Sequence, residues 1–163
     1  MNASAMPAAG DAAPDFTLPD DTGTDQTLSA QRGRWVVLFF YPGDFTPGCT
    51  TEVCEFRDLT PDFGDAGATV WSVSVLDAAS KAKFKAKHGL TFPLLADADH
   101  EVAERYGVWV EKKNYGKTYW GIGRATFLID PQGTVARVWP KVKVDGHAAE
   151  VLEAVRAAAG QAA

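Results

Sequence analysis

The chain has 163 residues, a formal net charge of −5, and a composition that is 46% hydrophobic and 23% charged. This length suits one domain with a full hydrophobic core rather than two, and the composition is that of a globular protein. The acidic balance, 21 Asp and Glu against 16 Lys and Arg, does not favour nucleic acid or an anionic membrane as a partner. No stretch approaches the roughly 20 apolar residues that a membrane helix needs.

The start of the chain, MNASAMPAAGDAAP, carries no positive charge ahead of an apolar core, so it does not resemble a secretory signal. We interpret residues 1–11 as a flexible lead-in and residues 12–163 as a single domain. The chain holds only 2 cysteines, too few for a disulfide scaffold. This favours a cytoplasmic protein whose thiols are redox-active or metal-binding rather than structural.

The hydrophobic pattern predicts elements that alternate between strands and helices. The run WVVLFFY (35–41) is continuous and rich in β-formers, which is typical of a strand buried on both faces. The helix after it has Val53, Phe56 and Leu59 on one side. In chain order we expect a β-hairpin over 15–28, a strand over 35–41, a helix over 49–63, a strand over 68–76, a helix over 79–89, a strand over 92–97, a short helix over 100–108, a hairpin of strands 124–130 and 134–142, and a final helix over 146–160.

This order of elements predicts a three-layer α/β domain with a mixed central β-sheet flanked by helices. It resembles the thioredoxin-like fold, with the hairpin over 15–28 as an N-terminal extension. The stretch KAKFKAKHG (81–89) is expected to be a solvated lysine face of its helix. Gly121 and Gly123 begin like a dinucleotide fingerprint, but Thr126 stands in the place of the third glycine and a strand follows, so we exclude nucleotide binding.

Both cysteines, Cys49 and Cys54, lie in the segment FFYPGDFTPGCTTEVCEF (39–56). Thr46 suits a helix N-cap and Pro47 the first helical position, which places Cys49 in the first turn. Free backbone N–H groups and the positive end of the helix dipole stabilise an anion there. A thiol pKa of about 8.5 can fall to about 7 or below in such surroundings, so the position predicts a nucleophilic thiolate.

The spacing of the two cysteines predicts a switch rather than a permanent disulfide. Five residues along an ideal helix separate the two Cα atoms by roughly 8–9 Å, whereas a disulfide needs less than about 7 Å. The pair can therefore bond only when the first turn unwinds. Such a cycle fits a thiolate that attacks a peroxide, becomes a sulfenic acid and condenses with the second thiol, after which an external reductant resets the pair.

The motif around Cys49 resembles that of a known enzyme family. Pro42, Thr46 and Cys49 match the Pro-x-x-x-Thr-x-x-Cys motif of peroxiredoxins. The Cys-x₄-Cys spacing, the run TPGCTTEVCEFRD and the later GIGRATFLID are similar to the bacterioferritin comigratory protein (peroxiredoxin Q) branch, over about residues 12–160. The resemblance implies an atypical two-cysteine, thioredoxin-dependent peroxidase that reduces hydrogen peroxide and organic hydroperoxides in antioxidant defence.

The resemblance also implies roles for single residues. Cys49 would be the peroxidatic cysteine and Cys54 the resolving one. Thr46 would hydrogen-bond the peroxide, Pro42 would screen the thiolate from water, and Arg124 would place its guanidinium beside the sulfur.

Three further residues are assigned less directly. Glu52, one turn after Cys49, would hold Arg124 in place; alternatively it is a solvated carboxylate or pairs with Arg57. Tyr41 is expected to help line the pocket, and Trp120 to lie near the site.

The implied partners are a hydroperoxide and thioredoxin or a similar dithiol reductant, with the chain a monomer or a weak homodimer. No metal, haem or nicotinamide is required in the chain, and its histidines form no zinc-ligand spacing with the cysteines. Two alternatives remain open. A protein disulfide reductase on this fold usually carries Cys-x-x-Cys, whereas a peroxide-sensing thiol switch would expose a surface for a binding partner.

Overall fold

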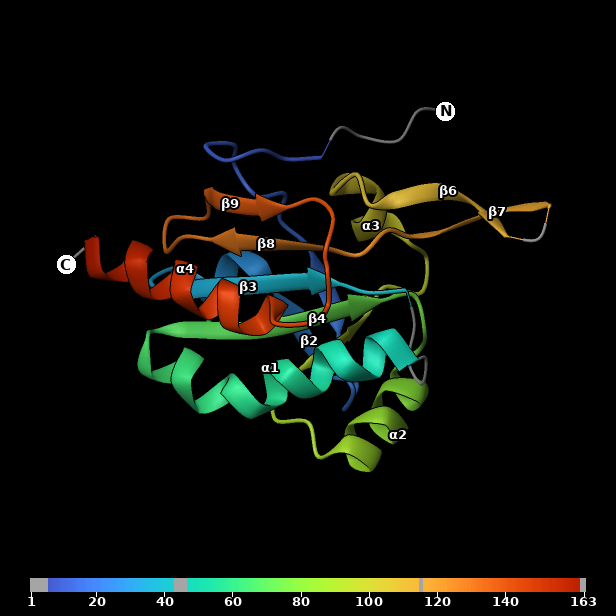
Figure 1. Cartoon of the computed structure of the whole chain (residues 1–163), viewed down its shortest axis with the longest axis horizontal. Helices are drawn as coiled ribbons and strands as arrows, with labels where there is room; N and C mark the ends of the chain where they lie inside the picture. Colours follow the sequence, from blue (N-terminus) through green and yellow to red (C-terminus); the bar gives the residue numbers. More distant parts are fainter. Residues whose placement is uncertain (1–5, 43–46, 115, 162–163) are drawn as a thin grey trace.

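A computed structural model of the chain describes residues 6–42, 47–114 and 116–161. Its centre is a mixed sheet of five strands in the order β5-β4-β3-β8-β9 (Figure 1). Strand β3 lies in the middle, parallel to β4 and antiparallel to β8. The bounds of the strands are β3 Trp35–Phe40, β4 Ala68–Ser74, β5 Leu94–Ala96, β8 Ala125–Ile129 and β9 Val135–Trp139.

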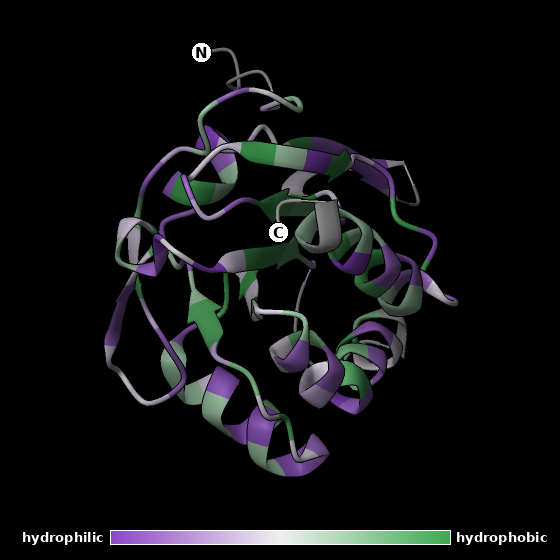
Figure 2. Cartoon of the chain, turned by 90° about the vertical axis from the view of Figure 1, so that its left-hand side faces the viewer, coloured by the Kyte–Doolittle hydropathy of each residue, from purple (hydrophilic) through white to green (hydrophobic). Residues whose placement is uncertain are grey.

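Helices cover both faces of this sheet. One face carries α1, α2 and α4, and the other carries α3, a short 3-10 helix and an N-terminal pair of strands. In Figure 2 the hydrophobic strands lie between helices whose outer sides are hydrophilic. The bounds are α1 Pro47–Asp65, α2 Ala78–His88, α3 Glu101–Arg105, α4 His147–Gln161, η1 Leu28–Gln31, β1 Thr17–Pro19 and β2 Asp25–Thr27.

The apolar run of β3 builds two cores at once. Successive side chains of a strand point to opposite faces, so Val37 and Phe39 join the core under α1 and α4, whereas Leu38 and Phe40 join the core under α3. All four side chains are fully buried, with 0% exposed. The prediction of a strand buried on both faces, in a thioredoxin-like α/β fold with an N-terminal hairpin, is therefore confirmed.

Two strands were not predicted. Strands β6 (Trp109–Asn114) and β7 (Lys117–Ile122) form a separate antiparallel pair, which we call the hairpin arm. Figure 1 shows the arm reaching outward from the body, on the side where β8 begins. Most residues of β6 are polar and much of β7 is exposed, so the sequence carries no continuous apolar run that would predict these strands.

The expectation of a solvated lysine face on α2 is wrong at one position. Lys83 and Lys87 are exposed, but Lys81 is fully buried, on the same inward side as Phe84. Lys81 Nζ donates to the Tyr41 hydroxyl at 2.9 Å and also to Ser74 Oγ. The sheet beneath α2 therefore supplies polar partners that let a lysine point inward.

The ends of the described chain are placed as follows. Of the predicted lead-in, residues 1–5 lie outside the described part, and residues 6–11 run beside β9, where the Gly10 amide donates to the Val135 carbonyl at 2.8 Å. Within the described ranges, no helix combines the length and the apolar character needed to cross a membrane.

Candidate active site

Cys49 lies in the first turn of α1, as its sequence position predicts. The helix begins at Pro47, so the sulfur is close to the helix N-terminus, where backbone N–H groups have no partner within the helix. The Cys49 side chain is fully buried, in the same core as Val37 and Phe39. Thr46, the predicted N-cap and peroxide ligand, lies outside the described residues.

Strand pairing places Arg124 beside this thiol. Ala125, the first residue of β8, pairs with Phe40, the last residue of β3. Arg124 therefore lies beside the point where the chain leaves β3 towards α1. Its Nη2 donates to Cys49 Sγ at 3.4 Å, and its Nη1 donates to Glu52 Oε1 at 2.5 Å. The structure thus brings Cys49, Glu52 and Arg124 together.

Glu52 is a buried carboxylate rather than a solvated one. Its side chain is 1% exposed, and among the described residues no donor reaches Oε2. Burial raises the pKa of Glu52 to about 7, because the loss of water outweighs the attraction of the Arg124 guanidinium. The alternative pairing with Arg57 is wrong, since the Arg57 guanidinium lies 2.8 Å from Asp58 Oδ1.

Arg124 keeps its charge in these surroundings. Burial by itself lowers the pKa of its guanidinium, but the Glu52 and Cys49 charges raise it by more, and the net shift is upward. The planar fork of donors lets one side chain bind a carboxylate and a sulfur at once. A cation held in this way stabilises a thiolate.

Tyr41 and Pro42 lie where the chain leaves β3. Tyr41 is fully buried, packs against Phe39 at a ring distance of 5.8 Å, and accepts the hydrogen bond from Lys81. Pro42 follows it as a half-buried residue. Tyr41 shares a core with Cys49, but it does not line the cavity next to Arg124.

Cys54 lies further along α1, and the helix is unbroken between the two cysteines. Both sulfurs are free thiols; Cys49 is buried and Cys54 is half-buried. The Cys54 sulfur raises the pKa of the neighbouring Arg57, after the larger effect of the Arg57–Asp58 hydrogen bond, so a cation also lies near the second thiol.

A cavity of about 340 Å³ adjoins the site. Arg124 forms part of its wall, together with apolar side chains at the base of the hairpin arm and after β9, among them Val108, Val110 and Val142. Trp120 does not line it; this side chain lies on β7 and is 50% exposed. The expectation that Trp120 lies near the site therefore gains no support from the residues that line this cavity.

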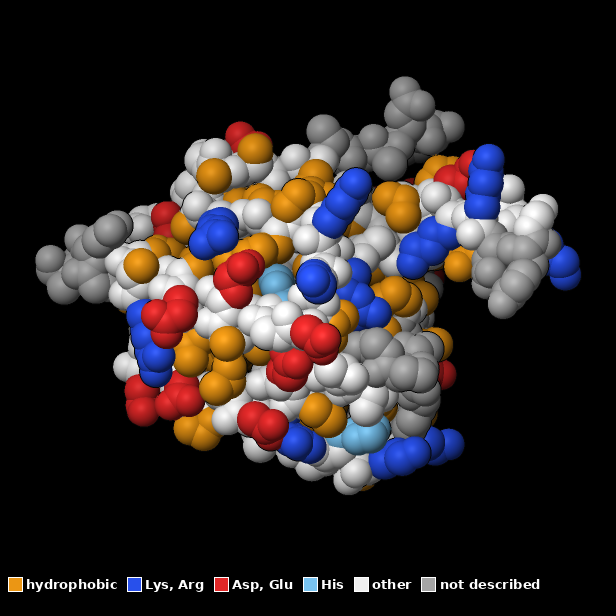
Figure 3. Space-filling view, viewed as in Figure 1, with side chains coloured by type: hydrophobic (Ala, Val, Ile, Leu, Met, Phe, Trp, Pro, Cys, Tyr) orange, Lys and Arg blue, Asp and Glu red, His pale blue; other side chains and the backbone are white. Residues whose placement is uncertain are grey.

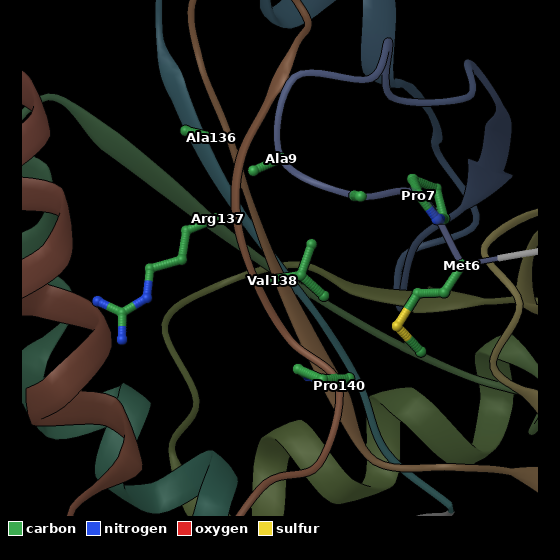
Figure 4. A pocket seen from close by; sticks show the side chains of 8 residues that line it. Met6, Pro7, Ala9, Ala136, Arg137, Val138 and Pro140 are labelled. Atoms are coloured by element: carbon green, nitrogen blue, oxygen red, sulfur yellow. The ribbon is translucent and has the colours of Figure 1, made fainter.

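A second cavity, of about 420 Å³, lies between the N-terminal segment and β9. Figure 4 shows Met6 and Pro7 on one side of it and Val138 on the other, with the Arg137 side chain directed away from Met6. None of the predicted site residues that the structure describes lines this cavity. In the described part of the chain, no group of three His, Cys, Asp or Glu side chains is arranged to hold a metal ion.

Comparison with known proteins agrees with this geometry. The sequence profile of the AhpC/TSA family matches residues 9–138. This chain belongs to that family. Among its relatives, Peroxiredoxin Bcp of Bacillus subtilis is 48% identical over 147 residues, which are 90% of this chain and 94% of that protein. Peroxiredoxin Bcp of Escherichia coli is 42% identical over 144 residues, 88% of this chain and 92% of that protein.

Solved structures place the peroxiredoxin in the same branch. A cysteine-to-serine mutant of Xylella fastidiosa PrxQ superimposes with a TM-score of 0.90 at 40% identity, covering 96% of this chain and 99% of that one. The bacterioferritin comigratory protein of Xanthomonas campestris superimposes with a TM-score of 0.84 at 46% identity, covering 88% and 92%. The expected resemblance to the Bcp and PrxQ branch is confirmed, and the chain is a thiol-dependent peroxidase with an antioxidant role.

Proposed function

We propose that Cys49 is the peroxidatic residue of this peroxidase. Its thiolate attacks the terminal oxygen of a hydroperoxide; an S–O bond forms, the O–O bond breaks, and the second oxygen leaves as an alcohol or water once it gains a proton. The sulfur is oxidised to a sulfenic acid while the peroxide is reduced. The hydroperoxide is hydrogen peroxide or an organic hydroperoxide.

The single observation that carries this proposal is the double contact of Arg124. One nitrogen contacts Cys49 Sγ at 3.4 Å and the other contacts Glu52 Oε1 at 2.5 Å. The guanidinium is thereby fixed where it stabilises the thiolate and the charge that moves to the leaving oxygen. The burial of Cys49 keeps water from weakening that attraction. In the proposal Thr46 donates to the peroxide and Pro42 shields the sulfur.

We further propose that Cys54 resolves the sulfenic acid. Its thiol condenses with the oxidised sulfur of Cys49, so that a disulfide forms and water leaves. Because α1 is continuous through both residues, its first turn must unwind before the sulfurs can meet. A dithiol protein, thioredoxin or one similar to it, then reduces the disulfide by thiol–disulfide exchange.

The place and assembly of the enzyme follow from this cycle. A dithiol reductant is maintained in reducing compartments, which favours the cytoplasm. Because the proposed cycle uses two thiols of the same chain, it requires no residue of a second copy, and we propose that the enzyme acts as a monomer or a weak homodimer.

A peroxide-consumption assay with thioredoxin and thioredoxin reductase, monitored through NADPH oxidation, tests the proposal. Wild type turns over continuously, Cys49→Ser does not, and Cys54→Ser consumes one equivalent of peroxide and then stalls. A fully active Cys49→Ser variant overturns the assignment. A single stoichiometric oxidation of wild type under excess reductant supports the sensor instead, and reduction of insulin without peroxide supports the disulfide reductase.

A further inference from the structure

Two neighbouring lysines lie on opposite faces of the hairpin arm. In the strand register Lys112 pairs with Tyr119, whereas Lys113 pairs with Thr118. Side chains of successive strand residues alternate between faces, so these two ammonium groups point in opposite directions. Lys112 is half-buried and Lys113 is exposed. Figure 3 shows basic side chains gathered over the arm.

The aliphatic stem of Lys112 lies over Gly121 of β7. A Cβ atom at Gly121 would be 3.7 Å from Lys112 Cδ and 3.8 Å from Lys112 Cε, so the stem of the lysine crosses β7 at this glycine. The face of the arm that carries Lys112 also carries Val110 and Gly123. A Cβ at Gly123 would be 3.4 Å from Val110 Cγ2, so the two strands stay close there as well.

This face of the arm leads to the active site. Val110 and Gly123 line the cavity beside Arg124, one step closer to the body than Lys112. Burial and the Arg124 charge lower the pKa of Lys112, whereas the Cys49 charge raises it. The Lys112 stem passes Gly121, which pairs with Val110, so the side chain runs along the arm from position 112 towards the cavity wall that Arg124 shares.

We propose that Lys112 is a second cation of the peroxidatic site, a positioning residue that stabilises the Cys49 thiolate from the hairpin arm. The proposal rests on Cys49 as the reactive thiol. A positive charge near a thiol favours its anionic form.

The test must separate the effect of Lys112 on the thiol from the effects of the other charged groups around the sulfur. Among the described residues, the charged or titratable groups around the Cys49–Arg124 pair include Glu52 on α1, His147 on α4, Lys112 on β6 and Lys141 after β9. Each comparison below changes Lys112 or its immediate support while the other groups stay as they are.

The experiment follows thiolate absorbance at 240 nm against pH in a Cys54→Ser background, so that Cys49 alone is observed. Lys112→Met raises the pH midpoint of thiolate formation by about half a unit to one unit, the scale expected of a nearby charge. Lys112→Arg, which keeps the charge, stays close to wild type. Lys113→Met, the matched control on the opposite face, leaves the midpoint unchanged.

Two further measurements guard against a merely structural effect. Gly121→Val fills the space under the lysine stem without requiring a strained backbone, and it shifts the midpoint in the same direction as Lys112→Met. High salt reduces the difference between wild type and Lys112→Met, because ions screen a half-exposed charge. An unchanged midpoint in Lys112→Met, or an equal shift in Lys113→Met, overturns the proposal. The titration reads the thiol directly, so it is separate from the turnover result for Cys49→Ser.

Discussion

Glu52 holds Arg124 by one oxygen only. Its Oε1 accepts a hydrogen bond from Arg124 Nη1 at 2.5 Å, while Oε2 has no partner among the described residues. The carboxylate therefore fixes the guanidinium without occupying both of its terminal nitrogens, and Nη2 stays directed at Cys49 Sγ. This division explains why an arginine, with its rigid fork, occupies the position.

The first prediction concerns Arg124→Lys. A single ammonium cannot bind Glu52 and Cys49 with two separate nitrogens, so one charge-assisted contact, worth about 1.5–3 kcal/mol, is lost. The second-order rate of reaction with hydrogen peroxide falls by roughly 10- to 100-fold in a stopped-flow measurement. Arg156→Lys is the control, because Arg156 is 51% exposed and pairs only with Glu153 among the described residues. An unaltered rate in Arg124→Lys contradicts the assigned role.

The second prediction uses the pH dependence of Glu52. Its pKa is about 7 in the folded state against 4.5 for the free side chain. Between these values the folded protein holds a proton that the unfolded chain releases, so stability falls as the pH rises from about 4.5 to about 7. Glu52→Gln removes this component, which is at most about 3 kcal/mol. Urea unfolding at several pH values measures it.

The control for Glu52 is Glu153→Gln, because Glu153 is 73% exposed. This variant should keep the pH dependence of wild type. Equal pH profiles for wild type and Glu52→Gln would show that the buried carboxyl does not titrate in this window.

The third prediction concerns His147. Its ring lies 6.0 Å from Phe56 and 5.8 Å from Trp139, and its Nε2 is 2.8 Å from Thr126 Oγ1. Burial lowers the pKa of His147 from 6.5 to about 4. The unfolded chain binds a proton that the folded protein excludes, so stability is lost as the pH falls from about 6.5 to about 4. His147→Gln should flatten this acid limb of the unfolding profile.

The half-buried His100 provides the comparison for that experiment. Its side chain is 41% exposed and its Nδ1 lies 3.0 Å from Glu104 Oε2, so His100→Gln shows what the loss of a partly exposed, paired histidine does to the same profile. An acid limb that persists in His147→Gln would assign the loss of stability to other groups.

Local sequence patterns were enough to predict the parts of the site that share one helix. The first-turn position of Cys49 follows from Pro47, and the proximity of Glu52 follows from a separation of three residues in a helix. The contact with Arg124 depends on the pairing of β3 with β8, which brings together residues more than 70 positions apart. Only the resemblance to a known motif indicated that contact in advance.

Local sequence patterns could not predict that Lys81 points inward, or that β6 and β7 form the hairpin arm, because both depend on contacts between distant residues. Whether Lys81 faces solvent is decided by polar partners on the sheet, Tyr41 and Ser74, which are distant in sequence. Lys112 and Lys113 are identical neighbours, and only the pairing of β6 with β7 places them on opposite faces, with Lys112 half-buried and Lys113 exposed. Charge counts and hydrophobic periodicity cannot distinguish Lys81 from the exposed lysines of α2, or Lys112 from Lys113.

The last prediction tests the unwinding of α1. In the reduced structure the helix is continuous through Cys49 and Cys54, so the amides of residues 51–56 should exchange slowly with deuterium. A disulfide between these residues cannot form within an intact turn. After one equivalent of peroxide, exchange over this segment should rise by at least about 10-fold, since local opening then costs almost no free energy.

Cys54→Ser isolates the cause of that change. This variant is oxidised at Cys49 but forms no intramolecular disulfide, so its α1 amides should remain protected after the same treatment. Faster exchange in Cys54→Ser as well would mean that sulfenic acid formation, rather than the disulfide, melts the turn. Equal protection of oxidised and reduced wild type would exclude the unwinding step, because the two sulfurs cannot bond across an unbroken helix.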